Sequence, residues 1–357
     1  MIDPAHAFGE RAGQAGIAVG RVTRNDVAIR AGVSAATVSY VVNNGPRSVA
    51  PATRERVLQA IRDLGYTPDA VARSLRTRHT GLLGLIVPDS TNLFFAELAR
   101  QIELAAEERG YHILLCNSGE DTAREQAHLE ALRQQRVDGV LLIPSDTVAS
   151  NPKSTGYGIP IVALDRSPLI SAQHIVRTAP EAGSALAVDH LVALGHRRIG
   201  FAHGPLRLSH ARQRLEGGIA ALQHYGLSPL PEWLIECNFD FAGGWHAAQM
   251  LLAQSSYPTA ICCGNDAIAV GLLAGLHAAG IVVPEVFSIV GFDDIPLARY
   301  AIPPLTTIAQ PYAAMAQRAL NALLVSACTP SSEITPETEE VLPVTLVQRR
   351  STAPPSV

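Results

Sequence analysis

The sequence has no uninterrupted apolar run that approaches the about 18 residues that a membrane-spanning helix needs. Its first 21 residues contain acidic side chains and no compact apolar stretch, which argues against a secretion signal. Only five cysteines occur among 357 residues, and they are scattered without the spacing of a metal site. The scatter indicates buried thiols in a reducing compartment, so we expect a cytoplasmic protein without a metal or another cofactor.

The sequence also lacks the short motifs of common enzyme classes. It contains no GxGxxG after a predicted strand, no Walker loop, no HExxH and no GxSxG. His196, in GHRRIG, is a candidate base, but it lies at a predicted helix end before a strand, where a cation satisfies carbonyl groups. An enzyme is the rival hypothesis, but because these motifs are absent we expect the protein not to be an enzyme.

Charge is distributed unevenly along the chain. Residues 21–80 contain ten arginines and four acidic residues, a net charge of +6, although the whole chain carries −4. Residues 81–357 carry −9. A basic N-terminal region before an acidic body is typical of one domain that meets phosphate and another that does not.

Residues 23–43 predict two short helices joined by a tight turn. Thr23 and Asp26 form a capping pair for the first helix. Gly32 stands where a left-handed residue would end that helix. An ordinary helical hairpin would share these features, so the second helix must decide between the two interpretations.

The second helix begins after Ser34, which can cap it, and we expect it to bury Val38 and Val42. Its outer face then carries Ala35, Ala36, Ser39 and Tyr40. A helix with small residues at its exposed N-terminal end can enter a major groove closely. The pattern favours a helix-turn-helix whose second helix recognises DNA.

A third helix is expected from Pro51 to about Leu64. The helical piece that follows, within residues 67–80, is too short to be stable alone and carries three arginines and an exposed Leu75. Such a segment could fold on DNA with Leu75 wedged into the minor groove. A plain solvated linker is the alternative.

From Leu82 onward, apolar runs alternate with amphipathic helical stretches. The apolar runs are 82–87, 111–116, 139–143, 160–164, 199–203, 259–263 and 288–292. The helical stretches are 94–109, 121–135, 181–195, 209–225, 242–254 and 266–279, and residues 145–158 resemble a loop. Continuous apolar strands between helices indicate parallel sheets covered on both faces. The units are too many for one simple sheet, so we expect two doubly wound subdomains, with an α/β barrel as the alternative.

Polar residues follow several of these strands, at the edge where ligands of such sheets bind. They are Asp89, Asp165, Arg166, Asn265, Asp266, Asp293 and Asp294, with Arg212 and Arg214 early in a following helix and Phe94, Phe95 and Phe239 nearby. These groups suit a polyhydroxylated ligand, because they bind hydroxyls in pairs while aromatic rings cover the C–H faces of a sugar. Structural roles are the alternative: Asn265 or Asp266 could cap a helix, and Asp294 could pair with Arg299.

Six stretches together resemble the LacI/GalR family of bacterial transcription regulators, from about Val22 to about Arg350. They are DVAIRAGVSAATVSYVVN, TRERVLQAIRDLGYTPDAVARSLRT, GLIVPDSTNLFFAEL, HLVALGHRRIGFAHGP, GNDAIAVG and VGFDDIPLARYAIPPLTTIAQP. The resemblance implies an N-terminal all-α helix-turn-helix headpiece and an α/β core, similar to type I periplasmic binding proteins, of two doubly wound parallel-sheet subdomains. A sugar-binding transport protein would need a signal peptide and no basic head.

The resemblance also implies the domain boundaries. A flexible tail would span 1–20, the headpiece 21–66, the hinge helix and linker 67–80, the core 81–350 and a second tail 351–357. Within the core, subdomain 1 would comprise about 81–176 and 308–338, and subdomain 2 about 177–307 and 339–350.

The resemblance further assigns roles to matching residues. Ala35, Ala36 and Tyr40 would read bases, Thr37 and Ser39 would lie near phosphates, and Ala72 and Leu75 would form the hinge pair. The DNA-binding candidates are Thr23, Ser34, Ala35, Ala36, Thr37, Ser39, Tyr40, Asn43, Ala72 and Leu75. The effector-binding candidates are Asp89, Phe95, Arg214, Phe239, Asn265 and Asp293.

These roles imply a sequence-specific DNA-binding repressor that is controlled allosterically by a small, sugar-like effector. Two heads imply a homodimer on a near-palindromic operator of double-stranded DNA. The sequence departs from the family in three places: Tyr40 stands where many relatives carry arginine, and Ala179-Pro180 replaces an Asp-Asn pair. No leucine heptad follows Arg350, which favours a dimer over a tetramer.

Overall fold

The computed structural model describes residues 22–42, 47–67, 79–145, 158–166, 172, 174–328 and 338–356. The chain divides into two units, of which the first ends at Arg78 and the second begins at His79. Several predicted features lie outside the described residues: the tail at 1–20, Asn43, Ala72, Leu75 and nearly all of the loop at 145–158.

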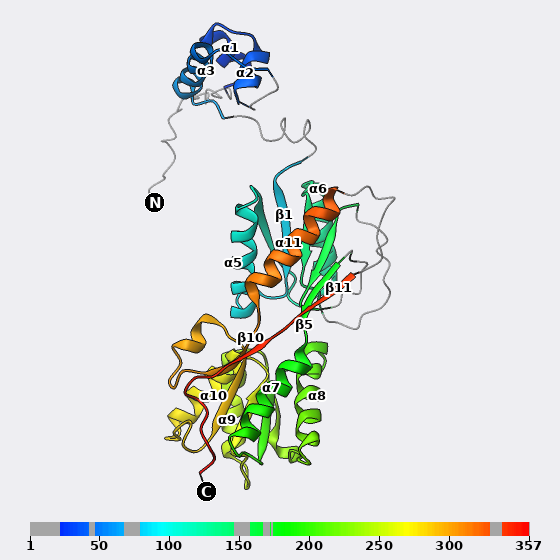
Figure 1. Cartoon of the computed structure of the whole chain (residues 1–357), viewed down its shortest axis with the longest axis vertical. Coiled ribbons are helices and arrows are strands. Elements are labelled where there is room, and N and C mark those ends of the chain that lie inside the picture. The colour runs from blue at the N-terminus through cyan, green and yellow to red at the C-terminus, as the bar shows by residue number, and fades with distance from the viewer. Residues whose placement is uncertain are drawn as a thin grey trace, which may run out of the picture. The chain divides into compact units, whose positions relative to one another are not determined.

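The described part of the N-terminal unit contains three helices: α1 (Arg24–Ala31), α2 (Ala35–Val42) and α3 (Pro51–Leu64) (Figure 1). The predicted capping pair is confirmed, because Asp26 N donates to Thr23 Oγ1 while Thr23 N donates to the Asp26 carboxylate. Gly32 ends α1 with φ at 67°, a backbone conformation that side chains disfavour. The Ser34 hydroxyl accepts from Thr37 N at 3.2 Å and so caps α2.

The core of this unit is made of small apolar side chains from all three helices. Val27, Val38 and Val57 are fully buried, and Val41 is 3% exposed. Val42 packs against this core as expected but is only half-buried, whereas Val41, one helical turn from Val38, is buried and was not expected to be. A spacing of three residues serves a helix face as well as a spacing of four.

Within its described residues, the larger unit contains two six-stranded sheets. The first has the order β2-β1-β3-β4-β5-β11, with every strand parallel to its neighbours. Its strands are β1 (Leu82–Val87), β2 (His112–Asn117), β3 (Gly139–Leu142), β4 (Ile161–Leu164), β5 (His174–Thr178) and β11 (Thr338–Leu342).

The second sheet has the order β7-β6-β8-β9-β10-β12, and only β12 is antiparallel to its neighbour. Its strands are β6 (Ile199–His203), β7 (Leu234–Glu236), β8 (Ala260–Cys263), β9 (Ser288–Asp293), β10 (Thr306–Ala309) and β12 (Thr345–Val347). Two separate, doubly wound sheets confirm the expected fold class and exclude the α/β barrel.

Helices cover both faces of each sheet. Figure 1 shows α5 (Leu93–Glu107) beside α11 (Tyr312–Cys328) on one face of the first sheet, and α6 (Thr122–Gln134) packs on the other. On the second sheet, α7 (Pro180–Ala193) and α8 (Ser209–His224) share one apolar cluster, while α9 (Phe241–Leu252) and α10 (Asp266–Ala278) share another. Two 3-10 turns complete the unit, at Pro231–Trp233 and Pro296–Arg299.

The chain crosses between the sheets three times, and the crossings differ from the expected positions. They fall between β5 and α7, between β10 and α11, and between β11 and β12. The third crossing lies furthest from its expected position near residue 338. Residues 338–342 pair with β5 as the edge strand of the first sheet, so they belong to the first subdomain. Likewise, β10 keeps residues 308 and 309 in the second subdomain.

The expected tail at 351–357 is instead packed on the second sheet up to residue 356. Ser351 is fully buried; its hydroxyl accepts from Thr306 N at 2.8 Å and donates to the Ile289 carbonyl at 2.6 Å. Further on, the Ser356 hydroxyl donates to the Glu285 carbonyl at 2.6 Å. The segment satisfies buried backbone groups of the sheet, which explains why it is held in place.

His196 takes part in the same packing and is not a cation at a helix end. It is 1% exposed, and its ring nitrogens contact the Thr259 and Ser288 hydroxyls and the Ala353 carbonyl. Burial lowers its pKa, so the ring is neutral. The cation at the end of α7 is Arg197, which donates to the Val192 carbonyl at 3.1 Å.

The cysteine side chains that the structure describes are free thiols. Cys237, Cys262 and Cys263 are buried, as expected, whereas Cys116 is half-buried. Burial raises the pKa of Cys237 and of Cys262 to about 12, which keeps both thiols protonated and unreactive. Among the described residues, no helix combines the length and the apolar character that a bilayer crossing requires.

Candidate functional site

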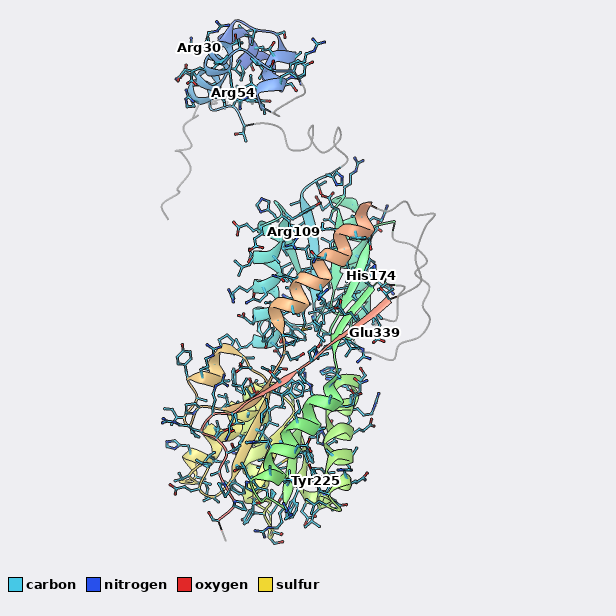
Figure 2. All side chains as sticks on the ribbon, in the orientation of Figure 1. Arg30, Arg54, Arg109, His174, Tyr225 and Glu339 are labelled. Atoms are coloured by element: carbon cyan, nitrogen blue, oxygen red, sulfur yellow. The ribbon has the colours of Figure 1, made fainter. Side chains whose placement is uncertain are left out.

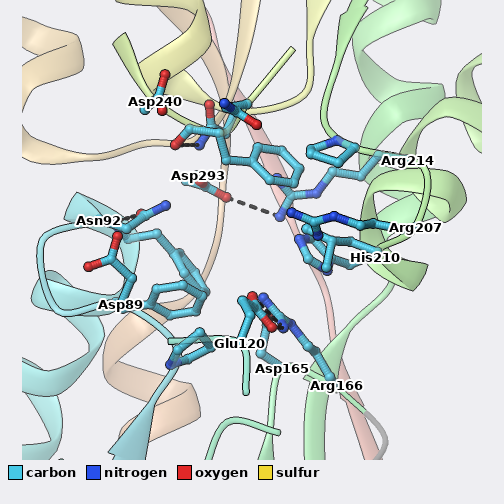
Figure 3. Close-up of a pocket in the computed structure, with 18 residues that line it drawn as sticks. Asp89, Asn92, Glu120, Asp165, Arg166, Arg207, His210, Arg214, Asp240 and Asp293 are labelled. Atoms are coloured by element: carbon cyan, nitrogen blue, oxygen red, sulfur yellow. Dashed lines mark hydrogen bonds and ion pairs between the residues drawn. The ribbon is translucent and has the colours of Figure 1, made fainter. Parts of the chain in front are cut away.

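A pocket of about 240 Å³ lies where the carboxyl ends of the two sheets meet within the larger unit (Figure 3). The first sheet contributes residues that follow β1, β2 and β4, and the second contributes residues that follow β6, β7 and β8 and the last residue of β9. The volume is below the roughly 300–1,000 Å³ of clefts that hold drug-sized molecules. The pocket is therefore suited to a small ligand.

All six effector-binding candidates line this one pocket. They are Asp89, Phe95, Arg214, Phe239, Asn265 and Asp293. Asp165, Arg166 and Phe94, which the strand-end argument also indicated, line it too.

Arg214 and Asp293 form an ion pair in the wall of the second sheet. Arg214 Nη2 lies 3.2 Å from Asp293 Oδ1, and Arg214 Nη1 donates to the Gly264 carbonyl at 2.6 Å. Their side chains are 10% and 4% exposed, so the pair is largely withdrawn from solvent. The guanidinium also lies over the Phe292 ring, 3.8 Å from its centroid, which fixes its plane.

Asp293 is the last residue of β9 and has a φ of 110°. Burial raises its pKa to about 6, although Arg214 and a 2.8 Å hydrogen bond from Gln310 Nε2 oppose that shift. Gln310 Oε1 accepts from the Thr178 hydroxyl at 2.9 Å. Since Thr178 and Gln310 lie at two of the chain crossings between the sheets, this carboxylate connects the pocket to the subdomain hinge.

Asn265 and Asn92 have matching positions in the two halves of the pocket. Asn265 Oδ1 accepts from Ile268 N at 2.8 Å and caps α10, while Asn92 Oδ1 accepts from Phe94 N at 3.0 Å and caps α5. The amide nitrogen of Asn265 donates to the Phe239 carbonyl at 3.5 Å. The structural and the binding interpretation of Asn265 are compatible, because an amide nitrogen has two hydrogens and Asn265 lines the pocket.

Aromatic rings form two walls. Phe239 is stacked with His210, with 5.2 Å between centroids and 18° between planes. A Cβ atom on Gly204 would come within 2.2 Å of the Phe239 ring, so the ring can occupy this place only beside a glycine. On the other side, Phe94 and Phe95 meet edge to face at 5.1 Å.

Three polar residues at the same edge of the sheets lie outside the pocket. Arg212 donates to the Leu206 carbonyl at 3.2 Å. Asp266 is fully buried, accepts from Ile295 N and the Thr307 hydroxyl, and has a pKa that burial raises well above its usual range. Asp294 pairs with Arg349 at 2.6 Å, so the suggested partner Arg299 is wrong.

The pocket also contains residues that the sequence argument missed. They are Pro88, Asn92, Glu120, Pro205, Arg207, Leu208, His210, Asn238 and Asp240. Glu120 follows β2 as Asp89 follows β1, so the same strand-end rule would have found it. His210 lies four residues before Arg214 on α8, a spacing that places both on one helix face.

The arrangement is built for binding hydroxyl groups. Carboxylates, guanidinium groups and the Asn265 amide line a space that also has aromatic walls. Figure 3 shows Asp293 beside Arg214 and Glu120 beside Arg166. Within the described part of the chain, Nε of Arg166 and Nε of Arg214 are buried without a hydrogen-bond partner. Such buried donors are satisfied when a ligand brings oxygen acceptors.

The headpiece presents most of its DNA-binding candidates at the surface. Ser34 and Ala36 are exposed, and Ala35, Thr37, Ser39 and Tyr40 are half-buried on α2. Thr23 is exposed as well, but its hydroxyl is engaged in the cap of α1. Arg30, whose side chain is 62% exposed, and Arg54 extend from the same unit and supply positive charge (Figure 2).

Known proteins match both units. Residues 23–69 match the bacterial regulatory proteins of the lacI family, and residues 188–352 match a periplasmic binding protein-like domain. A Haemophilus influenzae protein named ribose operon repressor is 40% identical over 303 residues, which cover 85% of this chain and 91% of that protein.

Solved structures agree with these matches. The Lac repressor dimer bound to operator and the anti-inducer ONPF is similar with a TM-score of 0.77 and 29% identity, over 93% of this chain and 99% of that one. An Enterococcus faecium LacI family transcriptional regulator with bound ribose gives 0.66 and 32%, over 77% and 100%. The chain belongs to the LacI family of bacterial transcription regulators.

Proposed function

We propose that this protein is a cytoplasmic, homodimeric repressor that binds a near-palindromic operator through its headpieces and a small sugar through the pocket of its larger unit. The single observation that carries the effector class is the convergence of Arg214, Asp293 and Asn265 beside the Phe239 ring. The relatives support the choice of sugar, since one is named ribose operon repressor and another was solved with bound ribose. Ribose is therefore the first candidate effector.

The pocket chemistry explains how a pentose would be held. The Asp293 and Asp89 carboxylates accept from ring hydroxyls, while Arg214 and Arg166 donate to hydroxyl and ring oxygens. The Phe239 ring covers one C–H face of the sugar. The small pocket volume limits the ligand to about the size of a monosaccharide.

The headpiece accounts for DNA binding. Ala35 and Ala36 at the start of α2 permit a close approach to base edges, and Tyr40 on the next turn reads further into the groove. The exposed arginines contribute the attraction to phosphate that every sequence offers. Domain roles follow the division of the chain: operator binding belongs to the N-terminal unit, and effector binding and dimerisation belong to the second.

The effector acts by changing how the two subdomains are held together. A sugar that bridges the carboxyl ends of both sheets contacts Asp293. The hydrogen-bond partner of Asp293, Gln310, lies at one chain crossing and contacts Thr178 at another. A ligand that favours one subdomain arrangement over another changes operator affinity, and operator changes sugar affinity by the same factor.

The test combines both ligands. We expect ribose to bind the purified dimer in isothermal titration calorimetry and to change its affinity for an operator duplex, selected from random sequences, by about 5- to 150-fold in fluorescence anisotropy. Arg214→Ala should bind the same duplex normally but lose the response to ribose. The exposed Arg212→Ala, which changes the same charge outside the pocket, should respond like the wild type.

Two results would contradict the proposal. A protein that binds every duplex equally at moderate salt would not be a sequence-specific repressor. A protein that selects one duplex but neither binds ribose nor any other neutral monosaccharide would keep its DNA function and lose the assigned effector class.

A further inference from the structure

Glu120 has an unusual backbone conformation at the edge of the pocket. Its φ is 56°, in the left-handed region that favours glycine. A residue with a long side chain persists there only when its surroundings hold it. The contacts of its side chain therefore indicate what the position is for.

The Glu120 carboxylate neutralises the guanidinium of Arg166. Arg166 Nη1 lies 2.9 Å from both Oε1 and Oε2 of Glu120 and donates as well to the Pro144 carbonyl at 3.2 Å. The Arg166 side chain is only 4% exposed, so water screens the pair little. Figure 3 shows the two side chains together at the wall of the pocket, next to Asp165.

Arg166 is placed to contact a ligand. Its guanidinium lies 5.7 Å from the centroid of the Phe95 ring, and its Nε is 3.7 Å from Asp165 Oδ2, beyond hydrogen-bond distance. Among the described residues, no acceptor bonds to that Nε. A guanidinium in such a place is a ready site for a phosphate or carboxylate group, unless a neighbouring carboxylate already holds it.

The charges that line the pocket favour an uncharged ligand. Five carboxylates face three arginines there: Asp89, Glu120, Asp165, Asp240 and Asp293 against Arg166, Arg207 and Arg214. Asp89, Asp240 and Arg207 are exposed, whereas Arg166, Arg214 and Asp293 are buried. A surplus of negative charge around the pocket repels an anionic ligand.

We propose that Glu120 is a charge filter: by holding Arg166, it makes the pocket accept a neutral sugar and reject the phosphorylated form of the same sugar. The proposal rests on the proposed function, since it assumes that the pocket binds a sugar. It adds that the free sugar, before any kinase acts on it, is the signal that the protein detects.

The test measures the Kd of three ligands by calorimetry: ribose, ribose 5-phosphate and 5-O-methylribose, a neutral control for size. We expect the wild type to bind ribose at least about 100-fold more tightly than ribose 5-phosphate. In Glu120→Gln, the preference should shrink by about tenfold or more, because the repelling charge is lost and Arg166 is released. The ratio of ribose to 5-O-methylribose should not change.

Three further variants keep the result interpretable. Glu216→Gln, on the exposed part of α8, removes the same charge outside the pocket and should leave all ratios unchanged. Glu120→Asp keeps the charge in a residue that tolerates the left-handed region and should retain the preference. If Glu120→Gln does not fold, Glu120→Gly removes the charge and suits the backbone, and it should show the same loss.

Different failures separate the two proposals. Suppose that ribose binds the wild type and that folded Glu120→Gln keeps a preference for ribose over ribose 5-phosphate within about twofold of the wild-type value. The charge filter is then wrong, and the sugar pocket stands. An equal change for 5-O-methylribose would make Glu120 a steric and not an electrostatic element, which also overturns the filter. A wild type that binds ribose 5-phosphate and not ribose overturns both the filter and the neutral-sugar assignment.

Discussion

The two halves of the larger unit share a strand order but hold their pocket residues differently. In the second half, the side chains of Arg214, Asn265 and Asp293 are buried. Each of them already forms hydrogen bonds within the protein in the absence of a ligand. In the first half, Asp89 is exposed and Asn92 half-buried, whereas Pro88, Arg166 and the two phenylalanine rings are buried. The second half thus holds its buried polar pocket residues in fixed positions, and we infer that it contributes more to ligand affinity than the first half.

If this comparison is right, the largest loss follows from breaking the preformed pair. Asp293→Asn leaves the buried Arg214 without its counter-charge, and we expect ribose affinity to fall by about 100-fold or more. Asp89→Asn, the matched change in the first half, should cost less than about tenfold, because that carboxylate is exposed. Calorimetry compares the two variants, and equal losses would show that the halves contribute alike.

A smaller loss should follow from displacing an aromatic wall of the second half. Gly204→Ala places a methyl group against the Phe239 ring, and we expect ribose affinity to fall by about tenfold. The double variant Gly204→Ala/Phe239→Ala should bind like Phe239→Ala alone, since the ring through which the methyl acts is gone. Additive losses in this cycle would mean that Gly204 acts on the pocket by another route.

The smallest effect concerns the pH dependence of stability in the second half. Burial lowers the pKa of His196 in the folded protein below its value of about 6.5 in the unfolded chain. Below about pH 6.5, the unfolded chain therefore binds a proton at His196 more readily than the folded protein does, which favours unfolding. The free energy of unfolding is therefore not reduced by His196 above that pH, and it decreases as the pH falls below it. Between pH 7.5 and 5, we expect the wild type to lose about 2–4 °C more in Tm than His196→Asn.

His277→Asn, at an exposed position of α10, is the control and should keep the wild-type pH dependence in the same calorimetric scans. Parallel curves for the wild type and His196→Asn would mean that the buried ring does not set the acid sensitivity of this half.

The parts of the fold with a strong apolar signal were predicted from the sequence. All seven apolar runs are strands, because continuous runs such as LLGLIV have only one use between amphipathic helices. The missed strands are short or partly polar. Three of them lie at sheet edges, namely β7 with three residues, β11 with the sequence TEEVL and β12, and two lie inside a sheet, namely β5 (HIVRT) and β10 (TTIA). Such segments become strands through pairing with a neighbour, which local sequence does not encode.

The site was predicted as far as the strand-end rule reaches. Asp89, Asn265 and Asp293 directly follow or end strands, so a parallel sheet brings them to one edge. The same rule could not distinguish Asp266 from Asn265, its neighbour in the chain. Asp266 is buried and accepts two hydrogen bonds from within the protein, whereas Asn265 lines the pocket. Which way adjacent side chains point at a helix start depends on packing that only the structure reveals.

The C-terminal segment has a practical consequence for handling the protein. Ser351 and Ala353 fill hydrogen-bonding places on β9 and beside His196 that nothing else in the described chain would occupy. Truncation after Arg350 would leave Thr306 N and the Ile289 carbonyl, both buried, without these hydrogen-bond partners, so we expect it to destabilise the second subdomain.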